Sequence, residues 1–268
     1  MLEQWVKKKV LITVRTYPAP SKKVIEASCT AGICDGEWIR LFPVPYRLLE
    51  YDKRFRKYQY IEVNTKTSSD IRPESFKIDI GSIKILNSEP ISTDDKWQER
   101  KNLVLPLKSK SLCWLYRQRV ATGRPTLGIF KPLTITGLEI KKSRTVWTES
   151  QRASLLQNPL FGSPPKQPLM KLPVDFFYLF KCDDPDCIGH RLSCTDWEIG
   201  ESYLKWKDEY GDNWENKFRE KYEYEMINKF DTHFYVGTVH GHPLEWIIIG
   251  LFYPPKASED AIQGSLFS

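Results

Sequence analysis

Short strand patterns, each ended by turn residues, occupy most of the first 90 residues of this 268-residue chain. Residues 10–14 form an apolar run of the length of a buried strand. The pair Asp35-Gly36 separates residues 25–34 from residues 37–44, and Asp-Gly is a preferred two-residue turn between antiparallel strands. We therefore expect a β-hairpin here, within a region built from short strands.

Helical patterns interrupt the strands without a regular strand–helix alternation. Two capping boxes, Thr148-x-x-Gln151 and Thr195-x-x-Glu198, predict helix starts. Apolar side chains that recur at every fourth position predict a long amphipathic helix in the C-terminal half: Trp214, Phe218, Tyr222, Met226 and Phe230. This order of elements favours an α+β fold over a parallel sheet.

Composition divides the chain into four parts. Residues 158–173 contain five prolines, which indicates a linker or an ordered loop. We expect residues 1–157 to form a basic, β-rich region of one or two domains, and residues 174–255 to form a smaller α+β domain. Residues 256–262 are mostly polar and begin a segment, 256–268, that we expect to be a flexible tail.

The net charge of +6 and the pI of about 8.8 make the chain mildly basic. Cations are concentrated in residues 1–60, whereas residues 183–231 are acidic in balance, which favours a polyanionic partner for the N-terminal half only. No apolar run approaches the roughly 20 residues of a membrane span. The N-terminus lacks the apolar segment of a secretory signal. We expect a cytoplasmic protein.

Three cysteines and a histidine cluster in the pattern Cys182-x4-Cys187-x2-His190-x3-Cys194. Cytoplasmic proteins rarely build disulfide frameworks. Thiolates and imidazoles are the preferred ligands of zinc, and a Cys3His set closes its tetrahedral shell without leaving a position for substrate. The pattern therefore predicts a structural Zn²⁺ site that stabilises the C-terminal region. An irregular loop with buried free cysteines is the alternative.

Two acids, Asp196 and Glu198, follow this cluster, and His190 precedes them closely. Carboxylates and histidine can hold a catalytic metal for phosphodiester hydrolysis, so a metal-dependent nuclease or nucleic-acid-modifying enzyme is an alternative function. Acids are also favoured in the first turn of a helix, whatever the function. No Gly-rich phosphate loop or serine-hydrolase motif is present. We favour a non-enzymatic role.

Cations and aromatic residues intermingle between residues 40 and 60. Single-stranded nucleic acids bind to such surfaces because cations follow the phosphates while rings stack on the bases. The predicted nucleic-acid-binding residues are Arg40, Arg47, Lys53, Arg54, Arg56, Lys57, Tyr58 and Tyr60. The expected ligand is DNA or RNA in single-stranded form. A solvated basic surface beside core aromatic residues is the alternative.

The last six residues, Gln263 to Ser268, end a polar segment with an adjacent Leu-Phe pair. They resemble the Gln-x-Ser/Asp-Leu-Phe peptide by which bacterial DNA replication and repair proteins bind the sliding clamp. The resemblance implies that Gln263 bonds the rim of the clamp pocket while Leu266 and Phe267 fill it. Such peptides occupy flexible chain ends. A tail that folds back onto its own domain, or a chance match, is the alternative.

Motifs spread along most of the chain support a wider resemblance. They are Thr16–Lys23, Cys29–Gly32, Trp38–Pro43, and Cys187-x2-His190 leading to Asp196–Glu198. In these motifs the chain resembles a bacterial family of unknown function with two OB-like barrels. The resemblance implies an α+β fold of short-stranded, antiparallel OB-like barrels with inserted helices, a class that often binds single strands or oligosaccharides.

Three functional hypotheses follow. The first is a nucleic-acid-binding accessory protein that the sliding clamp recruits to DNA. The second is the metal-dependent enzyme, and the third is an interaction adaptor without nucleic-acid contact.

Overall fold

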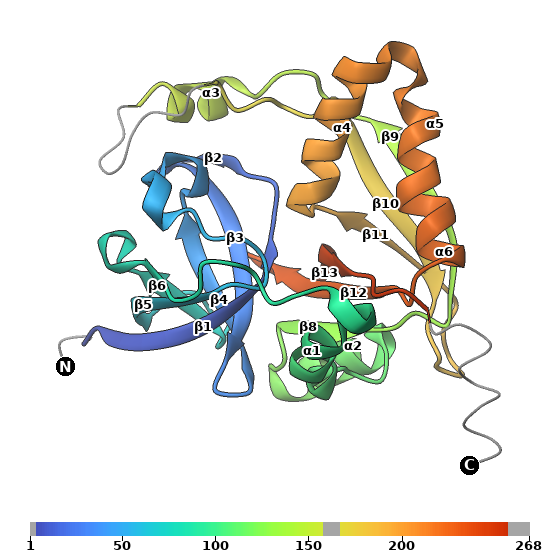
Figure 1. Cartoon of the computed structure of the whole chain (residues 1–268), viewed down its shortest axis with the longest axis horizontal. Coiled ribbons are helices and arrows are strands. Elements are labelled where there is room, and N and C mark those ends of the chain that lie inside the picture. The colour runs from blue at the N-terminus through green and yellow to red at the C-terminus, as the bar shows by residue number, and fades with distance from the viewer. Residues whose placement is uncertain (1–3, 158–166, 257–268) are drawn as a thin grey trace.

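Five strands of the N-terminal region close into a barrel in the computed structural model, which describes residues 4–157 and 167–256 (Figure 1). The strands are β1 (Val6–Arg15), β3 (Ile25–Cys34), β4 (Glu37–Val44), β5 (Tyr60–Thr67) and β6 (Ser75–Ile78). Their order is β1-β3-β4-β6-β5, and β5 pairs with β1 to close the barrel. Only β4 and β6 are parallel. This is the five-stranded Greek-key arrangement of an OB-fold.

The predicted hairpin is confirmed, since β3 and β4 pair around the turn at Asp35 and Gly36, which have φ angles of 53° and 77°. Positive φ at both central residues is what a type I′ turn requires. Alternate residues of the strands point inward to the barrel core: Val10, Ile12, Ile39, Leu41, Ile61 and Val63. Two 3-10 helices, Tyr46–Leu48 and Tyr51–Lys53, connect β4 to β5 and place Leu49 and Phe55 against that core.

A second six-stranded sheet repeats the same strand order. Its strands are β8 (Leu127–Phe130), β9 (Thr134–Lys142), β10 (Val174–Lys181), β11 (His190–Cys194), β12 (His233–Val239) and β13 (His242–Phe252). The sheet order is β8-β12-β13-β11-β10-β9, and its β11–β13 pair is parallel, as β4–β6 is in the first barrel. The remaining pairings are antiparallel.

One long strand of the first barrel corresponds to two short strands of the second. The first half of β1 pairs with β5 and its second half pairs with β3. Likewise β8 pairs with β12 and β9 pairs with β10. Residues 131–133, which include Pro132, separate β8 from β9, and proline cannot donate to a ladder. The chain therefore contains two barrels of OB topology, the second interrupted at this proline.

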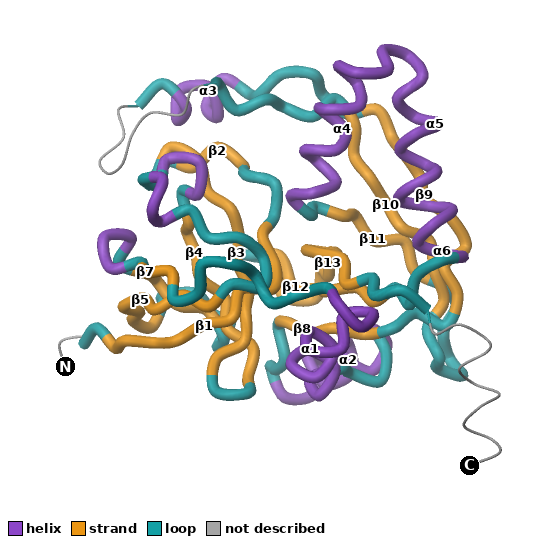
Figure 2. The backbone as a smooth tube through the Cα atoms, in the orientation of Figure 1, coloured by secondary structure: helices purple, strands orange, loops and turns teal. Residues whose placement is uncertain are grey.

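Helices fill the place between β11 and β12, and they lie along β9 and β10 (Figure 2). They are α4 (Trp197–Tyr210), α5 (Trp214–Arg219), a π-helical segment (Glu220–Glu225) and α6 (Met226–Asn228). The predicted apolar face packs on the second barrel, with Phe176 and Phe218 stacked at 4.5 Å between ring centroids. The N-cap of α4 is Asp196, which accepts from the Glu198 N–H, so the capping box predicted at Thr195 is corrected.

Two helices connect the barrels, α1 (Asp94–Val104) and α2 (Leu112–Thr122). A short α3 (Glu149–Leu155) begins at the predicted Thr148 capping box and packs on β2 (Ala19–Ser21). β7 (Lys84–Ile85) pairs with β5 at the edge of the first barrel. The strands β8 and β9 belong to the second barrel, which therefore begins after α2. This corrects the predicted domain boundaries, which placed residues 1–157 in one region and residues 174–255 in another. Among residues 4–157 and 167–256, no helix has the length and hydropathy of a membrane span.

The outer faces of β1 and β3 pack directly against β8, β12 and β13. This contact forms a third apolar core between the barrels, which includes Leu11, Val14, Ala31, Leu127, Ile129, Tyr235, Ile249 and Phe252. Leu11 alternates with Val10 and Ile12, which face the barrel interior, because successive side chains of a strand point to opposite faces. An irregularity in the β1–β3 register between Ile12 and Val14 then places Val14 on the outer face as well. Both faces of β3 and of the second half of β1, from Val10 to Val14, are consequently buried.

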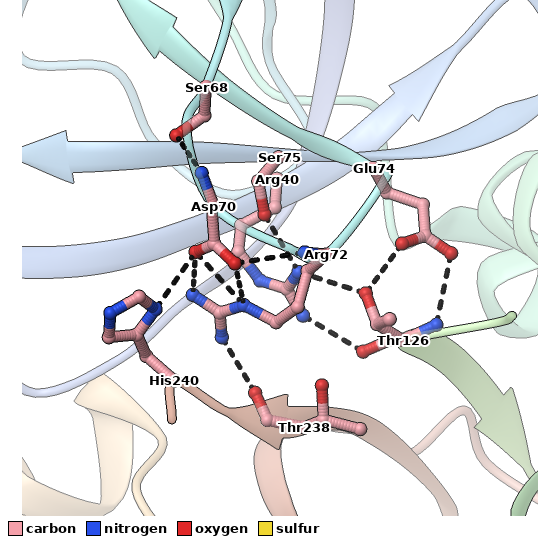
Figure 3. A network of polar contacts seen from close by, with 9 residues as sticks. All are labelled: Arg40, Ser68, Asp70, Arg72, Glu74, Ser75, Thr126, Thr238 and His240. Carbon is pink, nitrogen blue, oxygen red and sulfur yellow. Dashed lines mark hydrogen bonds and ion pairs between the residues drawn. The ribbon is translucent and has the colours of Figure 1, made fainter. Parts of the chain in front are cut away.

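A polar network borders this core (Figure 3). Arg40 on β4 is 1% exposed and donates to the Ser75 hydroxyl at 3.1 Å, the Thr126 hydroxyl at 3.0 Å and the Thr126 carbonyl at 2.8 Å. Glu74 accepts from the Thr126 N–H at 2.9 Å. The network joins the first barrel to the residue that precedes β8.

A second branch of the network crosses to β12 (Figure 3). Arg72 is held by the buried carboxylate of Asp70, with Nε 2.9 Å from Oδ1, and it donates to the Thr238 carbonyl at 2.7 Å. His240 lies 3.3 Å from the same carboxylate. Burial alone would raise the pKa of Asp70, but the Arg72 hydrogen bonds outweigh it and lower the pKa to about 2.

We predict that Asp70→Asn lowers the free energy of unfolding by about 3 kcal/mol at pH 7, because it leaves the Arg72 charge buried without its partner. A carboxylate with a depressed folded-state pKa stabilises fully above its unfolded pKa of about 3.9 and loses that effect as the pH falls toward 2. The difference between wild type and variant should therefore shrink between pH 4 and pH 2 in urea titrations. Asp208→Asn, at an exposed position, is the control and should change stability by less than about 0.5 kcal/mol. A difference that does not depend on pH would contradict this account.

Candidate metal centre and ligand-binding cleft

Four metal-ligating side chains meet at one end of the second barrel: Cys113, Cys182, Cys187 and His190. Their ligand atoms all lie within 4.8 Å of one another, and Cys113 Sγ lies 3.2 Å from His190 Nε2. A tetrahedral zinc with bonds of about 2.0–2.3 Å holds its ligand atoms roughly 3–4 Å apart. The cluster therefore has the composition and nearly the spacing of a Cys3His zinc site.

Local structure positions each ligand. Cys113 lies in the first turn of α2, whose N-cap Ser111 accepts from the Trp114 N–H. Cys182 follows β10, and its N–H donates to Cys187 Sγ at 3.2 Å, a bond typical of a metal-binding loop. Gly189, with a φ of 100°, permits the turn that brings His190 into β11.

A neighbouring carboxylate ties the two segments together. Asp184 accepts from the Ser111 hydroxyl at 3.3 Å and from Arg117 Nη2 at 2.6 Å. These contacts join the loop after β10 to the first turns of α2, and such contacts outside the ligand set orient metal ligands.

Burial and mutual repulsion act against three thiolates at this site without a cation. Burial, followed by the nearby Cys182 and Cys187 thiols, raises the pKa of Cys113 to about 12. Burial lowers the pKa of His190, which favours the neutral imidazole that a metal requires. Burial opposes ionisation of Cys187, but N–H groups of Cys182 and Gly189 outweigh it and lower its pKa. A divalent cation would offset the repulsion among thiolates.

Cys194 is a correction to the predicted ligand set. The structure brings Cys182, Cys187 and His190 together, but the fourth member of the cluster is Cys113. Cys194 lies at the end of β11, is 6% exposed and packs in the apolar core of the second barrel. Burial raises the pKa of its thiol well above the usual range. In the sequence, Cys113 stands in a helix remote from the other three, so spacing alone gave no reason to include it.

The acids considered for a nuclease site lie apart from the cysteine cluster. Asp196 is 2% exposed and accepts from the N–H groups of Glu198 and Leu251. Both Asp196 and Glu198 pair with Lys57, at 3.4 and 3.3 Å. Within the described residues, the cysteine–histidine cluster is the group found with metal-binding geometry, and it contains neither acid. Asp196 serves to cap α4 and to hold a cation of the other barrel.

Several of the predicted nucleic-acid-binding residues are buried, which corrects that set. Arg40 and Tyr58 are 1% and 3% exposed, and Lys57 is enclosed by Asp196 and Glu198. These side chains bind other parts of this protein.

The remaining members have partners of their own. Three of them form ion pairs: Arg47 with Glu26, Lys53 with Glu50, and Arg56 with Glu89. Arg54 donates to the Leu49 and Arg47 carbonyls. The ring of Tyr60 lies beneath the Lys9 ammonium. Sequence pattern alone could not separate buried from exposed cations.

A cleft of about 410 Å³ lies over β10 and β11 of the second barrel. These strands correspond to β3 and β4 of the first barrel, and OB-folds bind ligands at that face. The second barrel covers much of this face of the first barrel. The same face of the second barrel is open to the cleft. The lining residues include Tyr17, Trp147, Lys171, Asp175, Phe177 and Ser193.

Aromatic and cationic groups are paired in and beside the cleft. Lys171 Nζ lies 5.6 Å from the Trp147 ring, and Arg191 Cζ lies 3.6 Å from the Phe177 ring. The Trp147 indole donates to the Leu169 carbonyl at 2.9 Å, which fixes its ring. Sequence reasoning missed these residues because they are dispersed along the chain.

The predicted clamp-binding residues Gln263, Leu266 and Phe267 lie outside the described residues.

No curated protein matches this chain. Comparisons with solved structures give remote likenesses, among them the following two. "Crystal structure of the tetrameric p202 HIN2" has 8% identity over 96% of both chains and a TM-score of 0.32. "Structure and Conformational Change of a Replication Protein A Heterotrimer Bound to ssDNA" has 9% identity over 99% of this chain and 69% of that chain, with a TM-score of 0.27. Both scores are below 0.5, so neither likeness supports a fold or a function.

Two protein families match successive parts of the chain. Residues 6–106, which hold the first barrel and α1, match the family described as "Domain of unknown function (DUF8758)". Residues 108–268, which hold α2 and the second barrel, match the family described as "Domain of unknown function (DUF8757)". The division falls between α1 and α2, where the strand pairing also changes barrel. Because the second match spans more than half of the chain's length, the chain belongs to the DUF8757 family.

Proposed function

We propose that this protein is a cytoplasmic nucleic-acid-binding accessory protein whose second barrel binds a single strand in the cleft over β10 and β11. The observation that carries the proposal is the set of aromatic rings, Tyr17, Trp147 and Phe177, that lines this cleft beside Lys171. Stacking on rings tolerates every base, and nearby cations follow the phosphates. Asp175 also lines the cleft and limits how closely a phosphate approaches that end.

A structural zinc ion at Cys113, Cys182, Cys187 and His190 is the second part of the proposal. Four protein ligands fill the tetrahedral shell, so no position remains for a substrate or a reactive water. The ion would join α2 to the loop between β10 and β11, and hence hold the β10–β11 hairpin that forms the floor of the cleft.

Recruitment by the sliding clamp is the third part, and it rests on the resemblance of residues 263–268 to clamp-binding peptides. Leu266 and Phe267 would anchor the peptide and Gln263 would orient it.

We predict one zinc ion per wild-type chain in native mass spectrometry. Cys113→Ser should lose the ion, since three ligands bind zinc far less tightly than four. Cys194→Ala should keep it, because that thiol lies in the barrel core. Retention of zinc by Cys113→Ser together with its loss from Cys194→Ala would restore the ligand set expected from spacing and refute the one proposed.

We predict that Trp147→Ala weakens binding of a single-stranded oligonucleotide at least about fivefold, because stacking is worth roughly 1–3 kcal/mol per base. The dependence of affinity on salt should be unchanged, since the ring carries no charge. Tyr51→Ala, at an aromatic residue that is 90% exposed on the first barrel, is the matched control. Fluorescence anisotropy at several salt concentrations measures both quantities. Equal affinities of wild type and Trp147→Ala would exclude this cleft as the binding site.

We predict that the double variant Leu266→Ala, Phe267→Ala binds purified sliding clamp at least tenfold more weakly than wild type, since each buried anchor contributes roughly 1.5–3 kcal/mol. Ser268→Ala is the control and should bind normally. Calorimetric titration measures the affinities. If deletion of residues 262–268 leaves the affinity unchanged, clamp recruitment through this peptide is wrong.

A further inference from the structure

A pocket of about 340 Å³ lies between the two barrels and has an unusual excess of cations. Its lining combines four cations, Arg15, Arg56, Lys57 and Arg100, with one acid, Glu198, and three aromatic rings. The volume is within the range of small-ligand sites. We call this cavity the inter-barrel pocket.

Two of the four cations are already neutralised. Lys57 pairs with Asp196 and Glu198, at 3.4 and 3.3 Å. Burial acts against its charge, but the two carboxylates outweigh it and raise the pKa of Lys57 above its usual value. Arg56 pairs with Glu89 at 3.0 Å. Lys57 and Arg56 thus each form ion pairs with acids. The other two cations of the pocket are Arg15 and Arg100.

Arg15 is fixed in place without an acid at ion-pair distance among the described residues, although Glu201 interacts with its charge at longer range. Its guanidinium contacts two rings, 3.6 Å from the Tyr46 centroid and 4.3 Å from that of Trp197, and Nη1 donates to the Phe55 carbonyl at 3.3 Å. Its Nε is buried without a hydrogen-bond partner. A buried donor without a partner is costly to a protein, so the position of Arg15 is maintained at a cost.

Arg100 is held in the same manner. Its guanidinium lies 4.1 Å from the Tyr58 ring centroid and 4.9 Å from that of Trp97, and Nε donates to the Ile91 carbonyl at 2.8 Å. Burial lowers the pKa of Arg100. Within residues 4–157 and 167–256, no carboxylate lies within ion-pair distance of Arg15 or Arg100.

Backbone strain gathers beside Arg100. Tyr58 and Trp97, the rings on which it stacks, have φ angles of 64° and 66°. Asp95 and Lys96 are left-handed as well, so the first turn of α1 runs against its normal hand. Non-glycine residues adopt this conformation at a cost, and such residues collect at binding sites where the surrounding structure imposes them.

We propose that the inter-barrel pocket binds a phosphate group, with Arg15 and Arg100 as its two principal contacts. The two stacked guanidiniums exceed the one carboxylate that Lys57 leaves unbalanced, so the pocket keeps a positive charge for a phosphate group, and their planar donor sets match its oxygens. The volume exceeds that of phosphate alone, so the group arrives attached to a small molecule or at the end of a nucleic-acid strand. Arg15 and Tyr17 both contact the Trp197 ring, which places the pocket next to the cleft on β10 and β11.

Calorimetry with the full chain tests the proposal, using inorganic phosphate and a nucleoside 5′-monophosphate at constant ionic strength, with chloride as the blank. Arg15→Met and Arg100→Met should each weaken binding of both ligands about tenfold or more, since each removes charged hydrogen bonds. Arg124→Met, which removes an exposed arginine outside the pocket, should bind as wild type does. Urea titrations check that both pocket variants remain folded, since each substitution also removes ring contacts and a hydrogen bond to a backbone carbonyl.

Oligonucleotides with and without a 5′-phosphate identify the source of the group. Tighter binding of the phosphorylated strand, lost in Arg100→Met and competed by free phosphate, assigns the pocket to strand ends. Equal binding of both strands, together with binding of the monophosphate, assigns it to a small phosphomonoester. No binding of phosphate or monophosphate by wild type, or equal affinities in wild type and both arginine variants, overturns the proposal. Failure of the single-strand proposal is detected separately, because Trp147→Ala would then bind the oligonucleotide as tightly as wild type does.

Discussion

The packing of one barrel against the other determines which surfaces of this protein are available for ligands. Strands β1 and β3 bury one face in their own barrel and the other against β8, β12 and β13. The first barrel thereby gives up much of the face that OB-folds ordinarily use. What stays open is the equivalent face of the second barrel and the pocket along the seam. Both candidate sites are consequences of this single contact.

Buried charge shows how specific that contact is. Arg40 and Arg72 both reach from the first barrel to carbonyl groups of the second, at Thr126 and Thr238. Burying a cation is costly unless its donors are satisfied, so these contacts penalise any other arrangement of the barrels. The apolar core supplies the attraction between the barrels, and the two arginines select one orientation. An arginine in a basic segment can thus be a structural residue, while Arg15, which has no carboxylate at ion-pair distance among the described residues, is a proposed phosphate contact.

The difference between what could and could not be predicted follows from the range of the interactions. The hairpin at Asp35-Gly36 and the amphipathic face of α5 and α6 depend on neighbours in sequence, and both were predicted. The burial of Lys57 and Tyr58 depends on Asp196 and on the second barrel, which no local pattern reveals. The boundary between the barrels was misplaced for the same reason. The segments of β8 and β9 read as strands, but their pairing partners lie between 32 residues onward (Lys142 to Val174) and 110 residues onward (Leu127 to Gly237).

The observed cluster contains Cys113 where the sequence predicted Cys194, and this difference changes what a metal would do for the fold. The predicted ligands span 13 residues, so their cross-link would close only a small loop. Cys113 and His190 are 77 residues apart, and the entropy of closing a loop rises with the logarithm of its length. By that scaling, the longer closure removes roughly 1.5 kcal/mol more chain entropy from the unfolded state. A metal here would therefore secure the tertiary docking of α2 on the second barrel, and with it the connection between the barrels that carries Trp97 and Arg100.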